Sequence, residues 1–254
     1  AFDVSVPTWG FCGSPLVVGD RLLMQVAQDP GLIALDVWTG KLLWKTSKPE
    51  AAYSSLMLDL NPNARSNETA ASDQDTVIGL SAKGYFAVRA RDGKMIWQRQ
   101  PELDGDFGVP CPVVTSFGVV FCGENNGLLI RDHGKTELRT LDDTLLADSH
   151  TPVAIGNDLL VAYEGLHRID LTSGKRLWSV AENRITKYAS VIASDTIAWV
   201  FTEDAEWLSV DAGRGTLLDR RMLSENSIRT LTHPAVAGDR IIVRVGDEIR
   251  CWKL

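Results

Sequence analysis

Short runs of apolar residues, separated by tight turns, recur along the whole chain. Clear examples are SPLVVGDRLLMQV, CPVVTSFGVVFCG, TPVAIGNDLLVAY and HPAVAGDRIIVRV. Apolar runs of this length on either side of a Gly-Asp or Asn-Asp turn predict β-hairpins. No stretch of comparable length carries a convincing 3.6-residue period, so we expect helix to be scarce.

The hairpins belong to a longer repeat that is marked by a turn glycine. Gly40, Gly93, Gly134, Gly174 and Gly215 follow one another at spacings of 53, 41, 40 and 41 residues. Each repeat has room for four strands, which in the fourth repeat we place at about 151–155, 158–163, 165–170 and 175–180. Four strands repeating at this interval are typical of a β-propeller blade. We assign the one long spacing to a polar surface insertion between the first two strands of the second blade.

The two ends of the chain predict how the propeller closes. The last repeat stops after three strands, and residues 2–6 lie in the phase of a fourth strand. Because unpaired strand edges are costly, we expect residues 2–6 to pair beside 247–253. The prediction is a single all-β domain over residues 1–254, a six-bladed propeller closed by its N-terminal strand. The alternative is the C-terminal part of a larger propeller, since a chain cut in the same phase has the same pattern.

One sequence motif, DVWTGKLLW at residues 36–44, recurs as RARDGKMIW and DLTSGKRLW. The glycine permits the positive φ of a tight turn, and the aspartate accepts hydrogen bonds from turn amides. The tryptophan, on the outermost strand, can cover the seam between blades and donate its indole N–H to a backbone carbonyl. We therefore interpret these residues as structural: Asp36, Gly40, Trp44, Gly93, Trp97, Asp170, Gly174 and Trp178.

The same motifs resemble a known repeat. GLIALDVWTGKLLW and GLHRIDLTSGKRLW are similar to the repeat of pyrroloquinoline-quinone (PQQ) propellers, which include quinoprotein dehydrogenases and a barrel-assembly lipoprotein of bacterial outer membranes. The likeness spans most of the chain and is weakest where Leu138 and Asp219 replace the tryptophan. The resemblance implies the fold, and a bacterial protein that is periplasmic or otherwise exported. It does not settle activity, because the repeat also occurs in non-enzymatic members.

The resemblance offers two functions. Quinoprotein dehydrogenases of this family stack PQQ on a ring of adjacent disulfide-bonded cysteines and hold Ca²⁺ with carboxylate and amide oxygens. This chain has four cysteines and no Cys-Cys dipeptide. We therefore expect no cofactor and a non-catalytic scaffold that binds a protein or a ligand. The alternative is a PQQ-dependent oxidoreductase with calcium, or a degenerate relative of one.

Two histidines and two cysteines are candidates for further chemistry. His150 and His233 align near the starts of innermost strands, where we expect both rings to be exposed on the rim, with a two-histidine metal site as the alternative. Cys111 and Cys122 face each other if their hairpin turns at Ser116–Gly118. They are either a free buried pair or a disulfide.

Charge suggests where a ligand binds. The net charge of −7 argues against nucleic acid, and no apolar run approaches the ~18 residues of a membrane span. The loops before each first strand and between the second and third strands are rich in acids: Glu102, Asp104, Asp106, Glu124, Asp142, Asp143, Asp148, Glu164, Glu203, Asp204, Glu206, Asp247 and Glu248. An acidic face attracts small cationic ligands. The predicted ligand-binding rim consists of Trp9, Tyr53, Glu124, His150, Glu164, Tyr188 and His233.

Overall fold

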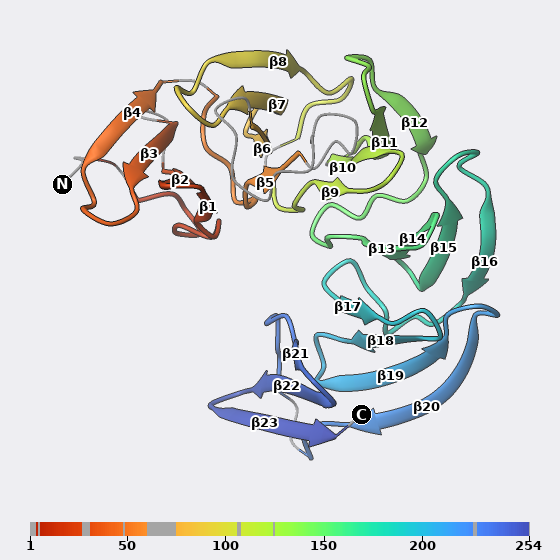
Figure 1. Cartoon of the computed structure of the whole chain (residues 1–254). Coiled ribbons are helices and arrows are strands. Elements are labelled where there is room, and N and C mark those ends of the chain that lie inside the picture. Colours follow the sequence, from red (N-terminus) through yellow and green to blue (C-terminus); the bar gives the residue numbers. More distant parts are fainter. Residues whose placement is uncertain are drawn as a thin grey trace. The chain divides into compact units, whose positions relative to one another are not determined.

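The computed structural model describes residues 4, 6–26, 31–47, 49–59, 75–105, 108–123, 125–225 and 228–253. Strands make up all of its regular structure, and no helix occurs in these residues. The chain divides into two compact units, Ala1–Asp148 and Ser149–Leu254. Each unit is a series of small antiparallel sheets (Figure 1).

The first unit contains three four-stranded sheets, each with its strands in chain order. The first sheet consists of β1 (Leu16–Val18), β2 (Arg21–Gln25), β3 (Leu32–Asp36) and β4 (Leu42–Thr46). The second consists of β5 (Met57–Leu58), β6 (Thr76–Ser81), β7 (Gly84–Arg89) and β8 (Met95–Arg99). The third consists of β9 (Val113–Val114), β10 (Gly118–Gly123), β11 (Gly127–Asp132) and β12 (Arg139–Asp142).

The second unit contains two four-stranded sheets and one sheet with three described strands. The fourth sheet consists of β13 (Val153–Ile155), β14 (Asp158–Ala162), β15 (Leu166–Asp170) and β16 (Arg176–Val180). The fifth consists of β17 (Ser190–Ala193), β18 (Ile197–Phe201), β19 (Glu206–Asp211) and β20 (Thr216–Met222). The sixth consists of β21 (Ala235–Ala237), β22 (Arg240–Val245) and β23 (Glu248–Lys253).

The sheets confirm the all-β fold class and the repeat of four strands. In the fourth sheet each predicted strand matches an observed one to within two residues. The polar insertion predicted between the first two strands of the second blade falls between β5 and β6, and most of it lies outside the described residues.

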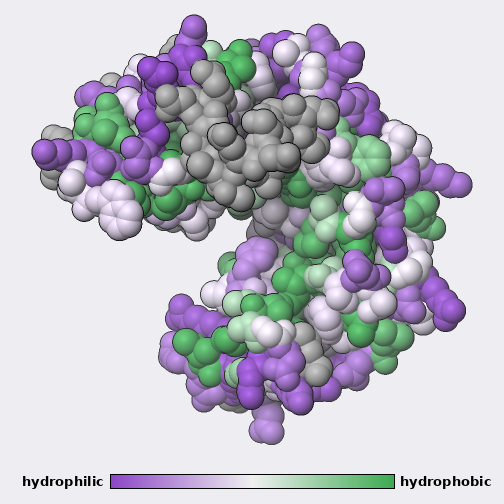
Figure 2. All heavy atoms as spheres, viewed as in Figure 1, coloured by the Kyte–Doolittle hydropathy of each residue, from purple (hydrophilic) through white to green (hydrophobic). Residues whose placement is uncertain are grey.

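The hydrophobic core lies between neighbouring sheets. Between the first and second sheets, Leu23 and Ala34 pack with Val77 and Phe86. Between the fourth and fifth sheets, Leu160, Ala162 and Leu166 pack in the same way with Val200, Leu208 and Val210. On the visible surface, hydrophobic residues occur in small groups among polar ones (Figure 2). Within each unit, neighbouring sheets are therefore stabilised mainly by burying their faces against one another.

The recurring tryptophan joins its own sheet to the next one. The indole N–H of Trp44 donates to the carbonyl oxygen of Ala90, at 3.1 Å. That of Trp178 donates to Ala212, also at 3.1 Å. Trp97 is buried, and the guanidinium of Arg131 from the following sheet lies 5.3 Å from the centre of its ring.

The rings of Trp44 and Trp178 also explain the glycine of the following turn, whereas a β-carbon at Gly134, which follows Trp97, would meet nothing within 4 Å. A β-carbon added at Gly93 would lie 2.7 Å from the ring of Trp44, and one at Gly215 would lie 2.6 Å from the ring of Trp178. Both glycines have positive φ, 70° and 68°. Glycine is therefore required at these positions for two reasons: the turn needs a positive φ, and the neighbouring ring leaves no room for a β-carbon.

A β-bulge precedes the tryptophan in three of the sheets. Trp44 pairs with Ala34, but the next pair along is Leu42 with Leu35, so Leu43 is the extra residue. Ile96 and Leu177 are skipped in the same way. All three bulged side chains are exposed. Since a bulge re-aims neighbouring side chains, it accounts for an exposed leucine or isoleucine directly before a tryptophan that packs inward.

The predicted closure by the N-terminal strand stays a prediction. Most of residues 2–6 lie outside the described residues, and the pairing partner, β23, is the last described strand of its sheet. Val4 is described, and it packs against Val26 and Ile33 of the first sheet.

The prediction that His150 is exposed on the rim is wrong. The ring is only 1% exposed, and its Nδ1 lies 3.0 Å from the carbonyl oxygen of Ala189. Its Nε2 is buried and has no partner among the described residues. Burial, with a smaller contribution from nearby His233, lowers the pKa of His150 to about 4. The chain leading into β13 turns the ring inward, where it links two neighbouring sheets.

The surroundings of two turn glycines predict that replacing each of them by alanine lowers the free energy of unfolding by different amounts. Gly40 and Gly93 have nearly the same φ, 67° and 70°, but a β-carbon at Gly40 would meet nothing within 4 Å. Gly40→Ala should therefore cost only the backbone strain, whereas Gly93→Ala should lower the free energy of unfolding by a further ~1–3 kcal/mol through overpacking. Urea unfolding of both variants measures the difference. Equal losses would contradict the proposed role of the Trp44 ring.

The buried histidine predicts a pH dependence. The ring is neutral when folded, while the unfolded chain takes up a proton near the ordinary pKa of 6.5, so the unfolded state binds more protons between pH 6.5 and about 4. The free energy of unfolding should therefore fall as the pH is lowered through this range, by up to about 1.4 kcal/mol per pH unit. Denaturant titrations of wild type and His150→Gln at several pH values test this. The variant should lose the part of the slope that His150 contributes, while His233, whose pKa partial burial also lowers, keeps a contribution of the same sign. An unchanged slope would rule His150 out as a source.

Candidate functional site

The segments that lead into the first strand of each sheet lie next to one another in the first unit. The amide of Ser14 donates to Oγ of Ser55, at 2.9 Å, and the amide of Tyr53 donates to the carbonyl oxygen of Gly108, at 3.1 Å. Trp9, on the first of these segments, is 67% exposed, and Tyr53 is partly exposed. The structure thus places these two predicted rim residues on neighbouring segments at one end of the unit.

The other described rim residues belong to the second unit. Tyr188 is exposed, and the cationic groups of Lys187 and Arg229 lie 5.6 and 5.4 Å from the centre of its ring. His233 and Glu164 are exposed, and Glu164 lies in the β14–β15 turn with φ of 50°. Glu124 lies outside the described residues.

Arginines neutralise part of the acidic face in the second unit. Glu206, expected on that face, is only 1% exposed; its Oε1 lies 2.9 Å from Arg184 and 3.5 Å from Arg220. Glu203 pairs with Arg229 at 2.9 Å. The expected surplus of acids is therefore smaller here than the sequence suggested, because Arg220 reaches the face from the outermost strand.

The turn residues of the repeat hold the opposite ends of the strands. Oδ1 of Asp36 accepts from the amide of Thr39, at 2.7 Å, and Oδ1 of Asp170 accepts from the amide of Ser173, also at 2.7 Å. Hydrogen bonds from the same Thr39 and Ser173 lower the pKa of both carboxyl groups. These contacts are local to the turn and leave no group aimed at a ligand.

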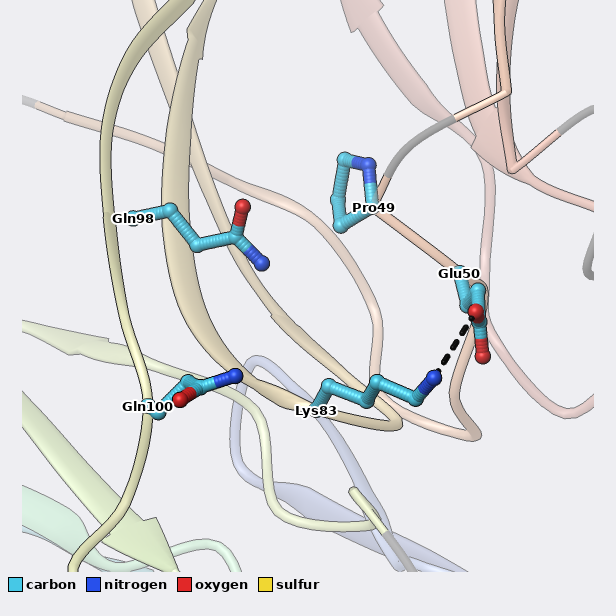
Figure 3. A pocket seen from close by; sticks show the side chains of 5 residues that line it. All are labelled: Pro49, Glu50, Lys83, Gln98 and Gln100. Carbon is cyan, nitrogen blue, oxygen red and sulfur yellow. Dashed lines mark hydrogen bonds and ion pairs between the residues drawn. The ribbon is translucent and has the colours of Figure 1, made fainter.

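A polar pocket of about 330 Å³ opens in the first unit. Its lining residues are Pro49, Glu50, Lys83, Gln98 and Gln100. Two side-chain amides, both from the outermost-strand side of the second sheet, form one wall, and an ion pair forms the other (Figure 3). In that pair Nζ of Lys83 lies 3.2 Å from Oε1 of Glu50.

Backbone contacts hold the walls of this pocket in place. The amide of Ala82 donates to the carbonyl oxygen of Glu50, at 3.2 Å, and Ala51 pairs with Ser81 in an isolated bridge. Oγ of Ser81 donates to the carbonyl oxygen of Gly84 and accepts from the amide of Lys83. Gly84, with φ of 123°, lies so close to β8 that a β-carbon would be 2.2 Å from the carbonyl oxygen of Arg99.

A smaller cavity of about 30 Å³ has Ser81 and Gly84 of the same turn among its lining residues. The other lining residues include Tyr85, Gly108 and Gly123. The hydroxyl of Tyr85 is buried without a partner among the described residues, and burial raises its pKa. The cavity is large enough for a water molecule.

No motif in the sequence predicts the polar pocket. Its residues come from segments about 50 positions apart, joined by the pairing of Ala51 with Ser81. The one local signal is the spacing of Gln98 and Gln100, two apart at the end of an outermost strand, which places both side chains on the same face.

No group of three or more His, Cys, Asp or Glu side chains within the described residues could hold a metal ion. All four cysteines are free thiols, including Cys111 and Cys122. No helix in the described part of the chain is long and apolar enough to cross a membrane.

Solved structures similar to the chain include a natural and a designed protein. BamB from Moraxella catarrhalis has a TM-score of 0.67 and 15% identity, over 94% of this chain and 69% of that one. The computationally designed Ika8 protein has a TM-score of 0.71 and 13% identity, over 95% of this chain and 70% of that one. At these identities the likeness concerns the fold alone. No curated protein matches the chain.

A family of PQQ-like repeat proteins matches the sequence itself. The match covers residues 5–180, and the family is described as outer membrane protein assembly factor BamB. The match spans more than half of the chain and agrees with the repeated sheets, so the chain belongs to this family of PQQ-like β-propeller repeat proteins.

Proposed function

We propose that this chain is a non-catalytic scaffold that binds a protein component of an outer membrane protein assembly machinery. The single observation that carries the proposal is the family match over residues 5–180. As an assembly factor it would work in the periplasm of a bacterium, or otherwise outside the cytoplasm.

The lead-in segments of the first unit offer the binding surface that we favour. Trp9 and Tyr53 lie there together with Phe11, which is 52% exposed, and the backbone beneath Tyr53 is fixed by its bond to Gly108. Aromatic side chains on a fixed backbone are frequent anchors of protein interfaces, because they bury a large area at a small cost in side-chain entropy.

An exposed tryptophan at the other end of the strands can serve as a control for the proposed binding surface. Trp38 lies in the β3–β4 turn and is 87% exposed, more than Trp9 at 67%. Connections between the second and third strands and between the third and fourth strands lie at opposite ends of an antiparallel sheet. Trp38 is therefore a matched aromatic residue outside the proposed surface.

The proposal predicts a loss of affinity that is confined to one end of the sheets. Trp9→Ala combined with Tyr53→Ala should raise the Kd for the assembly machinery by at least about tenfold, since interface anchors contribute ~1.4 kcal/mol or more. Trp38→Ala should leave the Kd within about twofold of wild type. Biolayer interferometry with the purified machinery of the same bacterium gives both values.

Two outcomes would count against this proposal. Wild-type protein that does not bind the machinery would exclude the function. Equal losses from the double variant and from Trp38→Ala would exclude the surface. Urea midpoints of all variants show whether each remains folded.

A further inference from the structure

The polar pocket beside the Ser81–Gly84 turn has a charge arrangement that restricts what it can bind. Glu50 and Lys83 carry opposite charges, and their charged atoms are 3.2 Å apart. A simple anion attracted to Lys83 therefore meets the carboxylate of Glu50, and a simple cation meets the ammonium of Lys83. The nearby opposite charge therefore offsets a large part of the attraction that a single charge would feel, about half of it when the ion lies in line with the pair.

A dipolar molecule can be attracted by both members of the ion pair at once. A ligand that carries a carboxylate and an ammonium group can lie antiparallel to the ion pair, with its carboxylate at Lys83 and its ammonium at Glu50. The lysine ammonium has three donors and uses one for Glu50, and the glutamate oxygens have further lone pairs, so the pair need not break.

The facing wall suits the same ligand. Each amide of Gln98 and Gln100 offers an acceptor oxygen for an ammonium and an N–H for a carboxylate. Figure 3 shows both amides on the side opposite the ion pair, with the space between them open. None of the five lining residues, all of them described, is aromatic, so the pocket lacks a platform for a stacked base or sugar.

The size and the fixed walls also favour a small molecule. About 330 Å³ is near the lower limit of the usual ~300–1,000 Å³ of ligand pockets. The backbone bond from Ala82 to Glu50 and the tight approach of Gly84 to β8 hold the two walls without help from the charged side chains. Fixed walls reduce the entropy lost on binding.

We propose that this pocket binds a zwitterionic molecule of the size of a free α-amino acid. This binding is separate from the proposed interaction with an assembly machinery, and it uses none of the aromatic residues of that surface.

Nuclear magnetic resonance of the side-chain amides of Gln98 and Gln100 tests the proposal directly. L-Alanine should shift these signals in a saturable way. Acetate and methylammonium, which carry one charge each, should bind at least about tenfold more weakly, as should uncharged N-acetyl-L-alanine methylamide. Absence of a saturable shift with L-alanine, or equal binding of acetate, would overturn the proposal.

Charge variants separate the dipole from either charge alone. Glu50→Gln and Lys83→Gln should each weaken L-alanine binding by about tenfold or more. The double variant Glu50→Lys with Lys83→Glu keeps a dipole of reversed direction and should retain most of the affinity. A double variant as weak as the single ones would contradict dipolar recognition. The backbone bonds of residue 50 do not depend on its side chain, and urea unfolding verifies that each variant is folded.

Discussion

The indole of Trp44 lies against Gly93 and donates to Ala90, both in the next sheet, and Trp178 repeats the arrangement with Gly215 and Ala212. A sheet of four short strands buries too little on its own, so its stability depends on the face that the following sheet covers. The tryptophan contacts mark the outer margin of that interface, and the apolar clusters between the sheets fill its interior. Every other feature of the molecule relies on this packing of sheet upon sheet.

The binding surfaces follow from the same packing. Stacked sheets bring their lead-in segments side by side, which is why Ser14 reaches Ser55 and Tyr53 reaches Gly108. The polar pocket likewise forms where the segment before β5 pairs with the end of β6. The residues that we propose for binding thus stand on backbone held by the scaffold, while their side chains take little part in stability.

Much of the fold was predictable from the sequence because its signals are local. Hairpin turns, the repeat length and the four strands of each sheet follow from apolar runs and turn residues, as the fourth sheet illustrates. Functional residues were less predictable. His150 occupies a lead-in segment like its neighbours, and only the backbone path decides that its ring turns inward to Ala189. Glu206 reads as a loop acid, but Arg220 from another strand neutralises it. The pocket of Glu50 and Gln98 depends on a long-range pairing that carries no motif.

The contact between tryptophan and glycine joins unlike partners, since the first sheet gives the ring of Trp44 to Gly93 of the second, and the fourth gives the ring of Trp178 to Gly215 of the fifth. This head-to-tail contact has the same form at both places and does not depend on how many repeats the chain has. A gene encoding this pattern can therefore duplicate or lose one repeat without inventing a new interface. Related proteins that share this tryptophan–glycine contact can therefore differ in their number of sheets. The number of repeats can change in evolution without a change in how neighbouring sheets pack.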